Sequence, residues 1–313
     1  MRGVGEEFRA VTQISMPAVW EARHMSQDNS SYRGGIVVAG TPLGNIDDAS
    51  PRLRHALATA DVVAAEDTRR ARNLANALGI DISGHLVSNF DHNESSRVDA
   101  LIKEAQRGRT VLIISDAGMP VISDPGFPVV ERAHDEGIHV GCVPGPSAVT
   151  TALAMSGLHV GTFCFDGFVP RKAGARREWL SSLATERRAC VFFESPHRIE
   201  ETLNAAVEIL GGDHRAAVCR ELTKLYEEVR RGTLEELASW AAEGIRGEIT
   251  VVLEGARDAN THPPVEDLVD DVEARVRTDG LRLKDACKVV ADQWGMRKKD
   301  LYEAVVDARK ASE

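Results

Sequence analysis

The sequence predicts an α/β protein of two domains followed by a small helical module. From residue 34 to residue 255, short β-branched apolar runs alternate with segments of helical periodicity, a pattern typical of α/β architecture. In the second half of this range, two strand-like runs follow one another without room for a helix, which favours a mixed sheet there. After residue 264, apolar residues recur at helical spacing.

The first domain is expected over residues 34–158 and begins with a strand. Five apolar runs predict its strands, at 35–39, 62–65, 86–88, 111–114 and 139–143. Ser50 followed by Pro51 is typical of a helix N-terminus, and Gly79 marks the end of the next helix. Further helices are predicted over 93–107, 127–135 and 147–156.

The second domain is expected over residues 159–255. Its predicted strands are 162–168, 189–194, 215–220, 226–231 and 248–253, and its helices are 172–184, 196–210 and 234–242. Residues 256–264 are polar and contain two prolines, so they are interpreted as a linker. Three helices are predicted in the tail module, 265–313, at 265–277, 282–294 and 298–311, an arrangement of helix-turn-helix type.

Composition limits the classes of function. The 313 residues have a net charge of −10, which disfavours broad nucleic-acid binding, although residues 171–188 are locally basic. Residues 1–33 lack periodicity and are expected to be a disordered or loosely held extension without a secretory signal. No run is long enough to cross a bilayer, so we expect a cytoplasmic protein with no membrane partner. Five widely spaced cysteines without a C-x-x-C pair predict buried thiols, with neither disulfides nor a metal site.

Three loops that follow apolar strands share a character: each is dense in glycine, proline, serine or aspartate. They are Thr41–Asn45, Asp116–Gly126 and Pro144–Ser147. Ligands bind at the carboxyl ends of strands in α/β sheets, so these loops predict a ligand held mainly by backbone groups. None matches a dinucleotide fingerprint or a phosphate loop, which argues against NAD and ATP.

Five motifs, in this order, make the chain resemble the tetrapyrrole methylase superfamily, and within it the ribosomal RNA small subunit methyltransferase I branch. They are Gly40–Asn45, Ala65–Arg69, Ser115–Gly126, Val143–Ala148 and Phe192–Arg198. The resemblance covers about residues 34–255. It implies two α/β domains with a cofactor cleft between them, S-adenosylmethionine as the cofactor, and pairing into a homodimer.

The resemblance also implies which residues contact the cofactor. In the first domain and its turns they are Pro42, Ile114, Asp116, Ala117, Gly118, Val121, Ile122, Ser147 and Ala148. In the second domain they are Phe193, Glu248 and Thr250. Their assignment from the superfamily is less direct, because the superfamily's sequence pattern is loose in this region. The alternatives to cofactor binding are that Asp116 only caps a turn and that Phe193 only packs in the hydrophobic core.

The implied reaction is 2′-O-methylation of a cytidine ribose in the decoding region of 16S ribosomal RNA. A 2′-hydroxyl is a poor nucleophile, so a carboxylate acting as general base would help it attack the methyl carbon. The preferred candidates are Glu66 and Asp67, followed by Glu194 with His197 and Arg198, and then Asp91 with His92. Each could instead be a helix cap or a surface ion pair.

Contact with RNA in the small ribosomal subunit is expected from basic side chains. The candidates are Arg69, Arg171, Lys172, Arg176, Arg177 and Arg198, with a second basic cluster at Arg297–Lys299 in the tail. Three rivals stay open: a methyltransferase acting on a precorrin-type tetrapyrrole, a diphthine-forming enzyme, and an RNA-binding module with an inactive cofactor site. The basic loop and the helical tail argue against the first.

Overall fold

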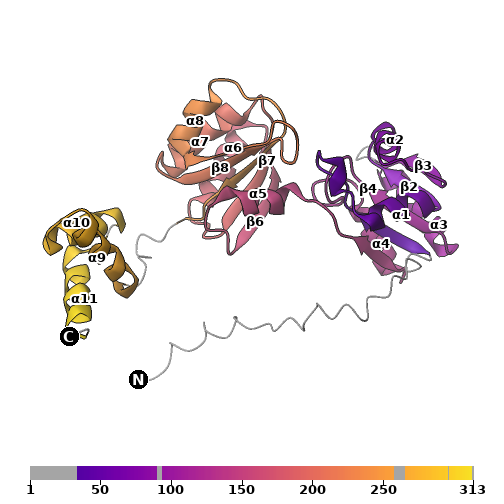
Figure 1. The fold of residues 1–313 in the computed structure, drawn as a ribbon. Helices are drawn as coiled ribbons and strands as arrows, with labels where there is room; N and C mark the ends of the chain where they lie inside the picture. The colour runs from indigo at the N-terminus through magenta and orange to yellow at the C-terminus, as the bar shows by residue number, and fades with distance from the viewer. Residues whose placement is uncertain (1–33, 90–93, 257–264, 295, 312–313) are drawn as a thin grey trace. The chain divides into compact units, whose positions relative to one another are not determined.

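The computed structural model describes residues 34–89, 94–256, 265–294 and 296–311 (Figure 1). The extension expected over 1–33 and all but the first residue of the expected linker lie outside the described residues, as do Asp91 and His92. No helix among the described residues is both long and apolar enough to span a membrane.

Contacts divide the chain into two units. The first contains the residues up to Thr41 together with Ala49–Gly145, and the second contains Pro42–Asp48 and the residues from Pro146 onward. Helix α5 (Ala148–Ser156) belongs to the second unit because its Val149 and Ala152 pack with Val191 and Ala217. The expected boundary after residue 158 therefore lies later in the chain than the one that the contacts give.

The first unit is built on a parallel sheet in the order β3-β2-β4-β1-β5. Its strands are β1 (Gly35–Ala39), β2 (Val62–Ala65), β3 (His85–Ser88), β4 (Thr110–Ile114) and β5 (Val140–Val143). Its helices are α1 (Pro51–Thr59), α2 (Thr68–Ala77), α3 (Glu94–Gln106) and α4 (Phe127–Asp135). Every strand and helix predicted for this unit is present within a residue or two of its expected bounds.

Local chemistry explains where these elements start and how they pack. Ser50 accepts a hydrogen bond from the Leu53 amide at 3.0 Å and caps α1, with Pro51 at the first helical position. One face of the sheet buries Ile36 and Ile113 against Leu101 of α3 and Val129 of α4. Because β4 is buried over most of its length at the centre of the sheet, the loop that follows it starts from a rigid support.

The second unit has a mixed sheet in the order β6-β7-β10-β8-β9, as the sequence predicted. Its strands are β6 (Phe163–Phe168), β7 (Ala189–Glu194), β8 (Arg215–Arg220), β9 (Glu228–Thr233) and β10 (Ile249–Leu253). Only β6 and β7 pair in parallel; the other pairings are antiparallel. Helices α6 (Ala173–Leu183), α7 (Ile199–Leu210) and α8 (Leu234–Ala241) cover one face, and α5 covers the other. A short helix, η2 (Ile46–Asp48), lies in the segment Pro42–Asp48.

Strand β9 begins two residues later than the predicted 226–231. A hydrogen-bonded turn takes up the preceding residues: the Lys224 amide donates to the Glu221 carbonyl, and the Glu227 amide donates to the Lys224 carbonyl, each at 3.0 Å. Tyr226 stays 69% exposed in this turn. The turn, rather than strand pairing, therefore occupies the first residues of the predicted segment.

The tail forms its own small core, as expected. The elements are η3 (Val265–Leu268), α9 (Val269–Thr278), α10 (Leu283–Trp294) and α11 (Lys298–Ala311). Their apolar faces bury Val272, Cys287, Val290, Leu301 and Val305 together. The stripe at helical spacing in the sequence is thus the interior of a helical module.

Candidate functional site

The turns after β1 and β4 are tied together at the carboxyl edge of the first sheet. The Thr41 amide donates to the Gly118 carbonyl at 2.9 Å, and the Gly118 amide donates back to the Thr41 carbonyl at 3.1 Å. The Thr41 hydroxyl is completely buried and donates to the Ser115 carbonyl at 3.3 Å. The start of the Ser115–Gly126 loop is therefore held in one conformation.

The turns after β2 and β4 are linked by a second pair of hydrogen bonds. The Asp116 amide donates to Glu66 Oε2 at 3.2 Å, and the Asp67 amide donates to Asp116 Oδ1, also at 3.2 Å. Arg70, one turn into α2, forms an ion pair of 3.2 Å with Asp116 Oδ2. Asp116 thus meets Glu66 and Asp67, about fifty residues earlier in the chain, at one edge of the sheet, as the parallel topology requires.

Asp67 and Asp116 differ in the pKa of their carboxyl groups. The Arg69 side chain and amide hydrogen-bond to Asp67 and lower the pKa of that carboxyl to about 2. Asp67 is also the N-cap of α2. Burial raises the pKa of Asp116, while the positive charge of Arg70 opposes that rise. Asp67 is consequently a weak base, held as a helix cap and an ion-pair partner.

The loop after β4 keeps an unusual backbone beyond Gly118. Val121 and Ser123 have φ angles of 77° and 62°, values that side-chain-bearing residues rarely adopt. Such conformations persist where the surroundings impose them, and they cluster at ligand sites. Ile122, between the two, is 49% exposed, so this loop presents apolar surface next to its backbone amides.

The other candidate cofactor residues of the first unit and its turns differ in burial and in hydrogen-bonding capacity. The side chain of Ile114 is buried at the end of β4, and its carbonyl accepts from the Glu66 amide at 3.3 Å. Pro42 is buried in the segment that groups with the second unit. Ser147 is the N-cap of α5 but makes no side-chain capping bond, and Ala148 packs on the core beneath it.

Within the second unit, Phe193 lies in an aromatic cluster. Its ring meets Phe165 and Phe168 edge-on at centroid distances of 5.0 and 5.4 Å, and Phe168 is 64% exposed. Thr250 is the register partner of Phe193 on β10 and is buried. Glu248 is exposed and receives a hydrogen bond from Lys224 Nζ at 3.0 Å.

Glu194 is enclosed by hydrogen-bond donors. Arg198 pairs with its Oε1, the Ser195 amide donates to the same oxygen at 2.7 Å, and the Thr202 hydroxyl donates to Oε2 at 2.7 Å. The Glu194 side chain is fully buried. These contacts fasten the start of α7 to β7, and they favour Glu66 over Glu194 as the candidate base.

The six candidate RNA-contacting side chains do not form one exposed set. Arg176 is only 3% exposed because it lies on the same face of α6 as Leu180 and Leu183, and it pairs with Glu201. The expectation that Arg176 contacts RNA is therefore corrected. Arg198 is held by Glu194, and the exposed Arg69 and Arg177 pair with Asp67 and Glu208.

Arg171 and Lys172 differ from the other four. Both are exposed, and neither forms an ion pair with another described residue. In the tail cluster, by contrast, Arg297 pairs with Asp300 at 3.0 Å and Lys299 with Glu303 at 3.7 Å. The two side chains before α6 are thus the best placed of the candidates to meet a polyanion.

Comparison with known proteins places the chain in a family. The profile described as Tetrapyrrole (Corrin/Porphyrin) Methylases matches residues 35–238. A Mycobacterium tuberculosis protein named ribosomal RNA small subunit methyltransferase I is 58% identical over 88% of this chain and 96% of its own length. The chain belongs to this branch of the tetrapyrrole methylases. A Halalkalibacterium halodurans protein of the same name is 42% identical over 86% of this chain and 94% of its own length.

A solved tetrapyrrole methylase shares the fold. The uroporphyrin-III C-methyltransferase from Thermus thermophilus, crystallised with S-adenyl homocysteine, superposes with a TM-score of 0.51 at 18% identity. The match covers 70% of this chain and 97% of that one. The resemblance on which the sequence analysis relied is confirmed, at the level of both family and fold.

Two residues at this edge of the sheet were not among the residues predicted to contact the cofactor, although Thr41 begins a loop predicted to bind a ligand. Thr41 bridges two turns, and Asn89 follows β3 at the same edge of the sheet. Asn89 is 2% exposed, and its side-chain carbonyl oxygen has no hydrogen-bond partner among the described residues. The available signal for both was a polar residue within two positions of the end of a strand.

The contacts of Glu194 generate a test of its role. Replacing Glu194 with alanine leaves Arg198 and Thr202 without their buried partner, so the free energy of unfolding should fall by about 3–5 kcal/mol. Urea denaturation followed by circular dichroism measures this change. The control is Glu208→Ala, which removes an exposed ion pair with Arg177 and should cost at most about 1 kcal/mol. Equal stability of the two variants would contradict the structural role of Glu194.

Proposed function

We propose that this chain transfers a methyl group from S-adenosylmethionine to the ribose 2′-oxygen of a cytidine in the decoding region of 16S ribosomal RNA. The observation that carries the proposal is the 58% identity, over nearly the whole length, to a ribosomal RNA small subunit methyltransferase I. The cofactor is supported by the related fold that was crystallised with S-adenyl homocysteine. The name of that relative specifies small-subunit ribosomal RNA as its substrate, and the choice of the 2′-oxygen of a cytidine goes beyond that name.

The residues of the first unit suit a cofactor that carries no phosphate. A sulfonium compound with adenine, ribose and amino-acid groups needs an apolar slot and polar partners rather than an anion-binding loop. Ile122 supplies exposed apolar surface, Asn89 offers a buried acceptor that lacks a partner among the described residues, and Ala117 and Gly118 lie on a fixed backbone. Asp116, whose carboxylate is already positioned, would fix one polar group of the cofactor.

The remaining cofactor contacts are proposed by motif position. In the first unit and its turns these are Pro42, Ile114, Val121, Ser147 and Ala148, and in the second unit they are Phe193, Glu248 and Thr250. Ser147 fits this role because its hydroxyl makes no capping bond to α5, so that bonding capacity remains for a ligand. Glu248 fits less well, since Lys224 already binds its carboxylate.

Glu66 is the residue that the geometry favours for proton removal. When bound, the cofactor supplies an electrophilic methyl carbon. The ribose hydroxyl must lose its proton as its oxygen attacks that carbon, and a carboxylate within hydrogen-bonding reach can take it. The Asp116 amide fixes one oxygen of Glu66. Asp67 is unsuited to the task, because a carboxyl with a pKa of about 2 holds a proton too weakly.

The proposal is tested on small ribosomal subunits from a strain that lacks the enzyme. The protein is incubated with methyl-labelled cofactor and these subunits, and the labelled nucleotide is mapped. We expect label on one cytidine of 16S ribosomal RNA, at a site that resists alkaline cleavage because the 2′-oxygen is blocked. Label on a base, or label only in an added uroporphyrinogen-type acceptor, would overturn the proposal.

A substitution at Glu66 tests the general base separately. Glu66→Gln keeps an oxygen that can accept the Asp116 amide but cannot take a proton, so turnover should fall at least about tenfold while the cofactor dissociation constant stays unchanged. Glu66→Ala should lose turnover to a similar or greater extent. Single-turnover kinetics and calorimetry give the two quantities.

The matched control for that experiment is Asp67→Asn. Asparagine caps helices about as well as aspartate, so α2 keeps its N-cap and the variant should keep turnover within a few-fold. If Glu66→Gln turned over at the wild-type rate, Glu66 would not be the base.

Arg171 and Lys172 are proposed to bind phosphates of the RNA, because each exposed cation that neutralises a phosphate releases a counterion. Replacing both with alanine should weaken binding to small subunits and reduce the slope of log affinity against log salt by about 1 to 2. Binding measured over a salt series gives the slope. Lys103→Ala with Arg107→Ala removes the same charge from two exposed positions, one on α3 and one directly after it, and should leave the slope unchanged.

A further inference from the structure

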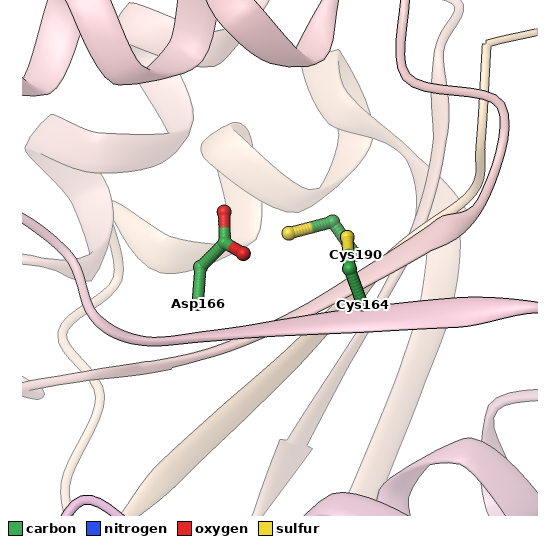
Figure 2. Close-up of side chains that lie close together, drawn as sticks. All are labelled: Cys164, Asp166 and Cys190. Atoms are coloured by element: carbon green, nitrogen blue, oxygen red, sulfur yellow. The ribbon is translucent and has the colours of Figure 1, made fainter.

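Two cysteines and one aspartate gather on the second sheet, and none of the three has a role in the proposed methyl transfer. Cys164 and Asp166 lie on β6, and Cys190 lies on β7 (Figure 2). Their sulfur and carboxylate oxygen atoms all lie within 4.8 Å of one another. Among the described residues, this is the one group of three or more histidine, cysteine or acidic side chains with that spacing.

Strand geometry places the three side chains together. Cys164 and Asp166 are two residues apart on one strand, so their side chains leave the same face of the sheet. Cys190 is the register partner of Cys164 on the neighbouring strand. That register is interrupted after Phe165 and resumes at Phe168, so Asp166 lies in an irregular stretch of the pairing. Irregularities of this kind re-aim side chains next to functional sites.

Solvent exposure increases across the group, from Cys190 through Cys164 to Asp166. Cys190 is 1% exposed, Cys164 is half-buried and Asp166 is exposed. The Trp179 indole N–H donates a hydrogen bond of 2.8 Å to Asp166 Oδ2. In Figure 2 the Asp166 carboxylate and the Cys190 sulfur face one another. The carboxylate is thus held toward the thiols although it is accessible to solvent.

We propose that Cys164, Asp166 and Cys190 form a binding site for a thiophilic divalent cation, with Zn²⁺ the best match. Two sulfur ligands select a soft or borderline ion, and one carboxylate oxygen is acceptable to zinc but not to a purely soft ion such as Cu⁺. Three protein ligands leave the fourth tetrahedral position to water. Trp179 is then a positioning residue, which orients the carboxylate ligand from outside the coordination sphere.

In the absence of a bound ion, the thiols of Cys164 and Cys190 are protonated. Burial is the main cause that raises the pKa of Cys190 and of Cys164 above the ordinary value for a thiol. A bound divalent cation deprotonates a coordinating thiol outright, so binding exchanges two protons for the ion. No redox change is involved.

The test uses the full chain, kept reduced with a non-thiol reductant and stripped with a chelator. Zn²⁺ is titrated in competition with a chromogenic chelator, and Co²⁺ is added to a second sample as a spectroscopic probe. We expect one equivalent of Zn²⁺ to bind and Co²⁺ to give sulfur-to-cobalt charge-transfer absorption. Zn²⁺ affinity should fall at least about tenfold in Cys164→Ser and in Asp166→Asn, and the charge-transfer absorption should weaken in Cys164→Ser.

Controls separate a ligand set from a general effect of cysteine. Cys142→Ser changes an exposed cysteine of the first unit and should leave both readouts unchanged. Trp179→Phe keeps an aromatic ring against Phe192, loses the indole donor, and should weaken Zn²⁺ binding by about tenfold. The proposal is overturned if reduced protein gives no charge-transfer absorption, or if the absorption is as strong in Cys164→Ser as in the unaltered protein. Since every readout is ion binding, failure here leaves the proposed methyl transfer untouched.

Discussion

Reciprocal hydrogen bonds between turns hold the loop that contains five of the twelve candidate cofactor residues. Thr41 and Gly118 exchange both of their amide bonds, and the Glu66–Asp67 turn exchanges two more with Asp116. Each bond joins segments about fifty or more residues apart, which only the parallel order of β2, β4 and β1 brings side by side. The positive φ angles of Val121 and Ser123 follow directly after this anchored stretch. A strained loop can persist there because its start cannot relax.

The fold could be predicted almost completely from the sequence, because local signals and burial agree throughout. Apolar runs such as 111–114 and glycines such as Gly137 mark strands and helix ends without tertiary information. The exceptions have tertiary causes. Helix α5 packs on the second sheet, which its own sequence cannot reveal, and the start of β9 is displaced by a turn that backbone hydrogen bonds stabilise.

The candidate site was predictable in its loops but less so in the roles of individual side chains. Motif positions located Glu66, Asp67 and Asp116, and the structure shows that Arg69 acidifies Asp67 whereas burial raises the pKa of Asp116. Whether an arginine is available to contact RNA depends on its burial and on its ion-pair partners, which the sequence alone does not reveal. Arg176 looked like its exposed neighbours in the sequence, but its position on the inner face of α6 buries it. The Cys164–Cys190 pair was equally hidden, since strand pairing rather than spacing along the chain brings the two sulfurs together. Homodimerisation remains a prediction.

The segment Pro42–Asp48 leaves the first unit and returns to it, while grouping by contacts with the second. Leu43 packs on the core beside α5, and the Asn45 amide donates to the Thr223 hydroxyl at 3.2 Å. The second unit is therefore discontinuous in sequence, and a fragment starting at Pro146 would lack a piece of its own packing. A single cleavage after Gly145 would leave the first unit on one fragment but would take Pro42–Asp48 away from the second. A recombination that exchanged only the residues after Gly145 would therefore have to preserve the packing of Leu43 and the hydrogen bond of Asn45 to Thr223.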